Sequence, residues 1–460
     1  MKPSILYRNR SFALNWQRWN QAFNEELLMK FRWPPFFSVI GLATTLCLMT
    51  SDIHALVLSV KSLGMAAVGV AYPQDSLVGG FNPAGTTEVP DRLDLGFTWA
   101  RDRQRTKIHG NLIPIIDGSF DAARTKDAYA PEFGLIKHIG IGTFCDVTLG
   151  IVAYNRSYVK TTYKTNFPIF GTSKLGLEYI HETLSPSIAM KFWDQLSVGI
   201  SVNYMLQRIK VNGLQLIDIP TRTAHIGHVT NRGYNYSQGV GVTFGILWDI
   251  TDCLKIGATY QPETSMTRFG RYTGFFSQRG KFNIPQKASG GISYRFLPCA
   301  TIAFDVEYIP WSDIAALRNP LKAKYVTTTN PLLPGFIPSR RLGKSKGIGF
   351  GWRNQTFYRV GADYALNDQL IVRAGYRYAK TPIRRSQTVT NQLLVDVIEH
   401  YITCGATWKV TRCQEISAYY AHGFYNKVKG KNSIPLAFGG GESDISHEQN
   451  VVGIAWGMFY

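Results

Sequence analysis

The chain has 460 residues, 45% of them hydrophobic, and a formal net charge of +19 at neutral pH. This length would ordinarily mean two or three soluble domains, yet no Ser/Pro-rich linker, charge block or low-complexity tract divides the sequence. The mean hydropathy of −0.09 excludes a helical membrane protein, and the spread of Lys and Arg along the whole chain argues against a nucleic-acid-binding protein.

Residues 29–55 have the organisation of a signal peptide, with two basic residues, an apolar run over 36–49 and a cleavage-like triplet that ends at Ala55. We expect residues 1–55 to be removed on secretion, and Met29 is a candidate for the true start. The apolar run is short for a helix that must cross roughly 30 Å of hydrocarbon. A retained anchor is the alternative.

Export would place the mature chain in an oxidising compartment, which changes how its cysteines are interpreted. An odd number remains after cleavage, and none has metal-like spacing. Their pairing stays open, and we assign them no catalysis and predict no metal or cofactor. They are Cys145, Cys253, Cys299, Cys404 and Cys413.

Residues 56–90 do not alternate and are rich in small residues that would allow a backbone to pack closely against its neighbours. Asn82-Pro83 is a turn dipeptide, and Gly85 supplies conformational freedom just beyond it. A segment this apolar needs to be buried. If the strands that follow close into a barrel, the lumen is the economical place, and the segment becomes a plug.

From Arg92 onward, segments of alternating apolar and polar residues recur with turn signals between them. Successive side chains of a strand point to opposite sides, so each segment predicts a strand with two different faces. We expect fourteen, an even number as a closed single-chain barrel requires. They are 92–101, 131–140, 146–159, 177–192, 196–209, 236–250, 253–269, 286–298, 301–312, 356–366, 369–380, 400–410, 415–428 and 451–460.

The connections between these strands alternate between turns of a few residues and long loops. Bacterial outer-membrane barrels have short periplasmic turns and long outer loops, whereas a β-sandwich would scatter its loop lengths. Residues 91–460 are therefore predicted to form an all-β, membrane-spanning, antiparallel up-and-down barrel. The long loops are 102–130, 159–174, 210–235, 271–286, 313–355, 384–398 and 429–448.

The last strand, 451–460, has bulky apolar residues at every second position and mostly small residues between them. This pattern predicts a closing strand whose bulky face meets lipid. It also resembles the C-terminal signal, an alternating strand with a terminal aromatic, by which the bacterial barrel-assembly machinery recognises outer-membrane proteins. We therefore expect a location in the outer membrane and that machinery as a partner.

The stretch GVAYPQDSLVGGFNPAGTTEV (69–89) resembles the N-terminal hatch of the FadL/TodX family, outer-membrane transporters of long-chain fatty acids and other hydrophobic compounds. Residues 254–275, 284–314 and 357–383 resemble strands and hairpins of the same family. The resemblance covers most of 63–428 and the C-terminus, with gaps in the long loops.

The resemblance implies capture of a ligand by outer loops 210–235 and 271–286, binding in the lumen, and sideways release when the hatch moves with a kink in the third strand, 146–159. Four residues, for which an ordinary turn is the alternative, would belong to the hatch: Asn82, Pro83, Ala84 and Gly85. The apolar candidates in the capture loops are Leu214, Leu216, Ile217, Phe275 and Phe276.

An anionic fatty acid would require a lumenal guanidinium near an apolar pocket. Arg359, Arg373 and Arg377 fall at inward-facing strand positions, where they avoid the roughly 2–4 kcal/mol cost of a charge facing lipid at the midplane. They are the candidate ligand-binding residues of the lumen. The alternative is that they pair with inward carboxylates on neighbouring strands, namely Asp305, Glu307 and Asp363.

The function that the sequence favours is passive uptake of hydrophobic compounds, long-chain fatty acids above all. A general diffusion porin, and a surface adhesin or antigen that binds through loops 313–355 and 429–448, are the alternatives. The absence of G-x-S-x-G, H-E-x-x-H and Walker motifs argues against an enzyme. We expect a monomer that contacts a hydrophobic ligand and outer-membrane lipid but no nucleic acid.

Overall fold

The computed structural model describes residues 59–460, apart from 125–126, 142–144, 168–169 and 329–333. The predicted leader, 1–55, and the alternative start at Met29 lie outside the described residues. None of the described helices is long and apolar enough to cross a bilayer.

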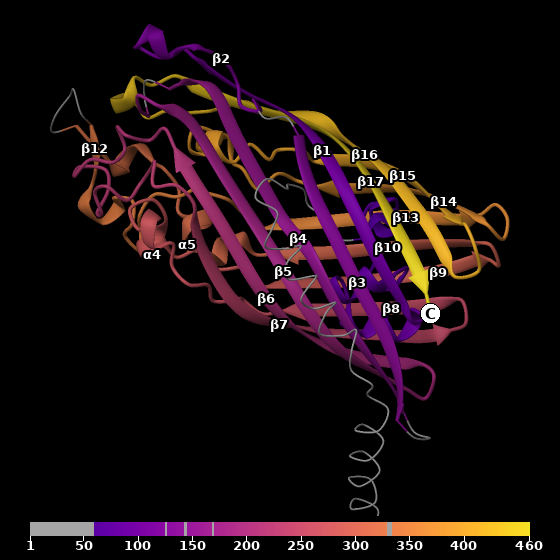
Figure 1. Cartoon of the computed structure of the whole chain (residues 1–460). Coiled ribbons are helices and arrows are strands. Elements are labelled where there is room, and N and C mark those ends of the chain that lie inside the picture. Colours follow the sequence, from indigo (N-terminus) through magenta and orange to yellow (C-terminus); the bar gives the residue numbers. More distant parts are fainter. Residues whose placement is uncertain (1–58, 125–126, 142–144, 168–169, 329–333) are drawn as a thin grey trace, which may run out of the picture.

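Fourteen antiparallel strands form one closed barrel, with the short connections at one end and the long loops at the other (Figure 1). The barrel closes where β17 pairs with β1, from Arg92↔Phe459 to His109↔Glu442. The predicted fold class and strand number are confirmed. The strands are β1 (Arg92–His109), β3 (Asp127–Ile141), β4 (Cys145–Asn166), β5 (Lys174–Phe192), β6 (Leu196–Asn212), β7 (Asn235–Thr251), β8 (Leu254–Gln261), β9 (Lys287–Leu297), β10 (Ala300–Ile309), β13 (Gln355–Ala365), β14 (Leu370–Ala379), β15 (His400–Lys409), β16 (Gln414–Val428) and β17 (Glu442–Phe459).

Some strand ends differ from the prediction. β1 continues to His109, beyond the predicted end at 101, because β2 and β17 both pair with its outer half. β8 ends at Gln261 and does not reach 269. Pro262 follows it and has no N–H to donate to a ladder, which stops the strand.

The remaining elements are short. Three lie before the barrel, and the others are in the outer loops. They are α3 (Val60–Leu63), η1 (Ser76–Gly80), η2 (Pro83–Glu88), η3 (Pro114–Ile116), β2 (Gly118–Asp121), η4 (Gly270–Tyr272), α4 (Ser277–Gly280), η5 (Trp311–Asp313), α5 (Ala315–Arg318), η6 (Ala323–Tyr325), β11 (Val326–Thr327), β12 (Gly335–Phe336), η7 (Pro338–Arg340), η8 (Arg385–Gln387), η9 (Thr390–Leu393) and η10 (Leu436–Phe438).

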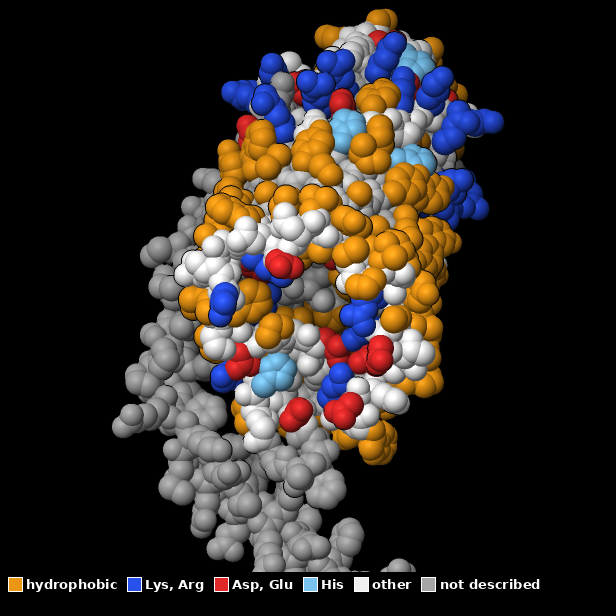
Figure 2. Space-filling model, turned by 90° about the vertical axis from the view of Figure 1, so that its right-hand side faces the viewer, with side chains coloured by type: hydrophobic (Ala, Val, Ile, Leu, Met, Phe, Trp, Pro, Cys, Tyr) orange, Lys and Arg blue, Asp and Glu red, His pale blue; other side chains and the backbone are white. Residues whose placement is uncertain are grey.

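The two faces of the wall have the chemistry that the alternation predicts. On β6, Val198, Val202 and Tyr204 are exposed, whereas Ser201 and Asn203 on the opposite face are buried. Hydrophobic side chains form a band across the wall, with Lys and Arg gathered above it (Figure 2). This band is the surface that faces lipid. The cysteines with described side chains, Cys253, Cys299, Cys404 and Cys413, are free.

The N-terminal segment, residues 59–89, lies against the inner faces of the strands at the short-turn end. Inward-facing glycines of the wall allow its backbone to approach. A Cβ on Gly199 would stand 2.5 Å from the backbone of Pro83 and Ala84, and one on Gly375 would stand 2.5 Å from that of Met65. The small residues of these strand faces are therefore the space that the segment occupies.

Candidate functional site

At the short-turn end, a buried polar network joins the N-terminal segment to the wall. Glu415 of β16 accepts from both Lys61 and Arg92, and Arg92 also donates to Asp94 of β1 through Nε at 2.8 Å. Asp94 in turn accepts from the backbone N–H of Ser76 at 2.9 Å. We call Lys61, Ser76, Arg92, Asp94 and Glu415 the inner network.

Further contacts tie the segment to the other side of the barrel. Asp305 of β10 accepts from the backbone N–H groups of Gly69 (2.8 Å) and Val70 (3.0 Å). Tyr72 donates to Asp363 of β13 at 2.6 Å. Because β10 and β13 lie several strands away from β1 and β16, the segment is held from more than one side of the barrel.

The predicted hatch residues lie in this segment. The Asn82 side chain caps η2 by accepting from the Ala84 N–H at 3.1 Å, and its Nδ2 donates to the carbonyls of Val70 (2.7 Å) and Ile246 (3.0 Å). Pro83 is the first residue of η2 and approaches Gly245 of β7. Asn82 therefore begins this turn and also joins it to the wall through its side-chain amide.

Ala84 and Gly85 are packed tightly on the same turn. Ala84 is fully buried with Ala71 and Leu247. At Gly85, an added Cβ would stand 2.7 Å from a methyl of Val78 and 3.0 Å from Pro73. This close packing leaves no room for a side chain at the glycine.

The three candidate lumenal arginines have different partners. Arg359 forms an ion pair with Glu307 at 2.8 Å, in line with the charge-balancing alternative. Arg373 donates to Gln74 of the N-terminal segment at 2.8 Å and to Thr407 at 2.6 Å.

Arg377, nearer the outer end of β14, lies 4.0 Å from the ring centre of Tyr401 and 6.0 Å from that of Phe357. Among the described residues, Arg377 forms no ion pair with a carboxylate. Arg373 forms none either, but it is buried and hydrogen-bonded to the N-terminal segment, whereas Arg377 is only partly buried.

The third strand of the barrel, β4, stops pairing with β3 partway along its length. Pairing between β3 and β4 runs from Ile141↔Cys145 to Glu132↔Tyr154, whereas β4 continues to Asn166. A bulge lies between Asn155 and Ser157 in the pairing of β4 with β5. A bulge bends a strand and increases its twist. The irregularity thus falls within the range predicted to hold a kink.

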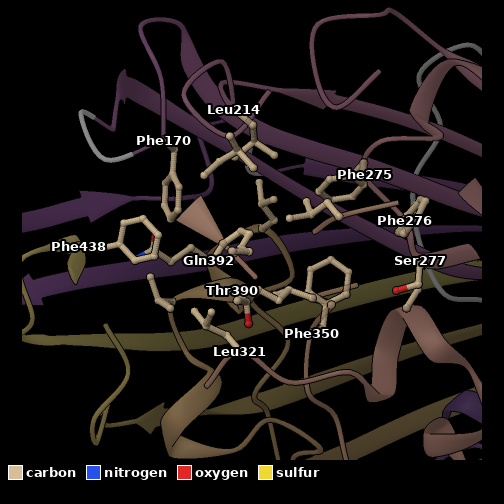
Figure 3. Close-up of a pocket in the computed structure, with 18 of the residues that line it drawn as sticks. Phe170, Leu214, Phe275, Phe276, Ser277, Leu321, Phe350, Thr390, Gln392 and Phe438 are labelled. Carbon is tan, nitrogen blue, oxygen red and sulfur yellow. The ribbon is translucent and has the colours of Figure 1, made fainter. Parts of the chain in front are cut away.

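At the outer end, the long loops enclose an apolar pocket of about 110 Å³ (Figure 3). Leu214, Ile217, Phe275 and Phe276 line it, so both predicted capture loops contribute. Leu216 does not line the pocket, and its side chain is 36% exposed. The capture-loop residues therefore divide into four that meet at one cavity and one that points elsewhere.

Most of the lining was not predicted, because it comes from loops that meet only in the folded chain. These residues share large apolar side chains within otherwise polar loops, and that contrast is the signal that could have identified them. They are Phe170, Leu321, Phe336, Leu342, Ile348, Phe350, Val389, Leu393, Ile434 and Phe438.

The pocket wall is held together by aromatic contacts. The rings of Phe275 and Phe276 lie 4.8 Å apart, and those of Phe336 and Phe438 lie 6.0 Å apart. Polar groups are few, chiefly Gln392, whose Nε2 donates to Ser443 at 2.8 Å. A cavity with this lining takes up apolar groups without strong directional contacts.

Comparison with known proteins agrees with this arrangement. Residues 50–460 match the family described as outer membrane protein transport protein (OMPP1/FadL/TodX). A comparison with curated proteins found no match.

Two crystal structures have similar folds. A Pseudomonas aeruginosa FadL homologue has a TM-score of 0.64 and 16% identity, over 89% of this chain and 99% of that one. The P. putida toluene transporter TodX has a TM-score of 0.61 and 14% identity, over 89% and 99% of the two chains. At these identities the likeness concerns the fold, while the sequence match over most of the chain establishes the relationship. The chain belongs to the FadL/TodX family of outer-membrane proteins that transport hydrophobic compounds.

Proposed function

We propose that this protein takes up hydrophobic compounds passively, long-chain fatty acids among them, through three steps. Ligand enters the apolar pocket under the outer loops, passes to the lumen, and leaves sideways when residues 59–89 move. The observation that carries this proposal is the pairing of a Phe-rich outer pocket with an inner end filled by the chain's own N-terminal segment.

The pocket sets a limit on how a ligand could bind. Its volume of about 110 Å³ is close to the roughly 150 Å³ of an engineered cavity that binds benzene. One aromatic ring or the end of an acyl chain fits that space. Arg377 would meet a carboxylate at the later, lumenal step.

The Asn82–Gly85 turn would act as the hatch element beside the sideways exit. The exit would lie between β3 and β4, above the last pair, Glu132↔Tyr154. Glu132 accepts from the Val60 N–H at 3.1 Å, so the N-terminal segment bonds to the wall at this point. Movement of the segment would free the edge of β4.

We also propose that residues 451–460 serve as the assembly signal for the barrel-assembly machinery, and that the protein acts as a monomer. The bulky outward face of β17, with Val452 and Ile454 exposed, supports the first point. The closed pairing of β17 with β1 supports the second, because the first and last strands of the wall pair with each other and not with another copy.

The direct test is to purify the protein in several non-ionic detergents and identify bound molecules by mass spectrometry. We expect acyl or aromatic compounds, and we expect added deuterated dodecanoate and toluene to bind at micromolar concentrations. An absence of any bound amphiphile in every detergent, with no binding of either probe, would contradict the proposal. Equal uptake of small polar solutes would favour the porin alternative.

A further inference from the structure

The outward face of β1 changes from apolar to cationic partway along the strand. Leu95 and Phe97 are exposed, and Trp99 follows them, a residue type that marks the interface of a membrane. Beyond Trp99, toward the long loops, the next four outward side chains are exposed cations: Arg101, Arg103, Arg105 and Lys107. We call these four residues the basic ladder. On the face that Figure 2 shows, Lys and Arg likewise gather above the apolar band.

The basic ladder stands on a tall part of the wall. β1 and β17 have 18 residues each and pair along their whole length, whereas β8 on the opposite side of the barrel has 8. At about 3.4 Å per residue, the four cations extend over roughly 20 Å of strand. With the strands tilted by about 40°, this corresponds to roughly 15 Å of depth above the hydrocarbon.

The neighbouring strands place one carboxylate opposite each cation of the basic ladder. These carboxylates are Asp127, Glu448, Asp121 and Asp444, in the order of the cations that they face. None of the four carboxylate side chains is exposed, whereas all four cations are. Among the described residues, only one cation of the ladder forms an ion pair, Arg103 with Glu448 at 3.5 Å.

Two of these carboxylates already have other donors. Asp127 accepts from Trp99 Nε1 at 3.1 Å, and Asp444 pairs with Lys427 of β16 at 2.8 Å. The exposed ends of the basic ladder are therefore positive, above a lower layer of carboxylates that are bonded elsewhere. A row of like charges that stands clear of its counter-charges attracts an anionic surface.

The foot of the basic ladder adjoins a belt of polar side chains on the outside of the wall. Asn450 of β17 lies directly opposite Arg101. Its Oδ1 accepts from the Tyr420 hydroxyl at 2.7 Å and lies 2.9 Å from Nδ1 of His422. These groups form hydrogen bonds without carrying a fixed charge. They are suited to contact uncharged polar groups such as sugar hydroxyls beside the cations.

We propose that the basic ladder binds the phosphates of lipopolysaccharide, the phosphorylated glycolipid of the outer leaflet, with its acyl chains against Leu95 and Phe97. The guanidinium fork matches the oxygens of a phosphate in pairs. The polar layer of a phospholipid is only roughly 5–8 Å deep on each side of a bilayer, about half the depth of the ladder. A headgroup of several sugars with phosphates at different depths fits the ladder better. The inference does not rest on the proposed function, because the ladder lies outside the barrel.

The test measures binding of fluorescently labelled lipid A to the full chain in non-ionic detergent. The wild type is compared with Arg101→Gln/Arg105→Gln. The matched control is Lys409→Gln/Arg412→Gln, which removes two exposed charges at the short-turn end. Arg101→Lys/Arg105→Lys keeps both charges of the ladder and provides a second reading if the Gln variant folds poorly. Heat-dependent migration on gels verifies that each protein is folded.

We expect the affinity for lipid A to fall roughly tenfold to thirtyfold in the Gln variant of the ladder, as for two cations removed from beside an anionic lipid surface. The control should bind like the wild type, and the Lys variant should stay within about threefold of it. Dephosphorylated lipid A should bind weakly and equally to all four proteins. Equal affinities of the ladder and control variants, or a Lys variant as weak as the Gln variant, would overturn the inference.

A phospholipid arm separates the glycolipid from other anionic lipids. In the same detergent, the wild type should bind lipid A more tightly than phosphatidylglycerol. Equal binding of the two would mean that a single layer of phosphate is enough, which would overturn the assignment to lipopolysaccharide. Binding of deuterated dodecanoate should be the same in the wild type and the ladder variants, so this inference and the proposed function can fail separately.

Discussion

Two regions of the barrel interior differ in what they bury. Residues 59–89 pack closely against glycines of the wall. Their charged and backbone groups are paired with wall residues, as Lys61 is with Glu415. Under the outer loops, phenylalanine rings surround an open cavity. Polar contacts are directional and hold one position, whereas apolar surfaces accept many shapes. The inner region is therefore suited to closing the lumen, and the outer region to receiving varied ligands.

The largest effect should come from removing a charge of the inner network. Glu415→Ala would leave Lys61 and Arg92 buried without this partner, and breaking a buried pair costs about 3–5 kcal/mol. Thermal melting in detergent would measure the loss. The control is Glu448→Ala, whose contact with the exposed side chain of Arg103 spans 3.5 Å and is expected to contribute less than about 1 kcal/mol. Similar shifts in melting temperature for the two variants would mean that the inner network stabilises the protein no more than the ion pair of the control, and the distinction drawn for the inner region would fail.

A side chain at a wall glycine should displace the N-terminal segment. Gly199→Val would overlap the backbone of Pro83 and Ala84, at an expected cost of about 1–3 kcal/mol. We expect a lower melting temperature and an increased leak of ions through the variant in planar bilayers. Gly290→Val is the control, because no neighbouring atom lies within 4 Å of the position that its Cβ would take. A leak in the control, or none in Gly199→Val, would argue against close packing as the seal.

Substitutions in the outer region should lower the affinity for ligand more than they lower the stability of the fold. Phe170→Ala would enlarge the apolar pocket and remove contact area, lowering affinity for an alkyl ligand roughly tenfold if about half of the burial energy of a Phe is lost. Leu216→Ala, on a capture loop but outside the pocket, should bind like the wild type. Fluorescence titration with a labelled fatty acid would compare the two. Equal affinity in both variants would mean that ligand enters elsewhere.

The smallest expected effect is on the melting temperature at acid pH. Asp91, just before β1, accepts from Lys137 and from the His138 N–H at 2.7 Å. Although burial would raise the pKa of its carboxyl, these bonds lower it. A lowered pKa stabilises the fold above the ordinary value of about 3.9, and that contribution disappears as pH falls through the folded-state value. Melting temperature should decline below about pH 4, and less so in Asp91→Asn. Parallel profiles would contradict the assignment.

The sequence predicted the strands of the barrel wall better than the contacts made inside the barrel, for a physical reason. Alternation has period two on a strand, so the faces of β6 and β14 follow from local order alone. The partners of the inward arginines do not, since Arg359 and Arg377 have the same parity and differ only in what neighbouring elements place beside them.

The outer pocket was even harder to predict from the sequence. Phe170, Phe336 and Phe438 come from three loops separated by more than a hundred residues each, and no local pattern brings them together. The backbone bond from Arg279 to Gly343, too, joins two loops that no local pattern brings together. Long loops gain their structure from one another, which a period along the chain cannot express.

Single-channel conductance of the intact wild-type protein in a planar bilayer tests the proposed closure most directly. With residues 59–89 packed across the inner end, we predict no large steady current, and only brief openings when dodecanoate is added. A large, steady conductance without ligand would show an open lumen and contradict the closure.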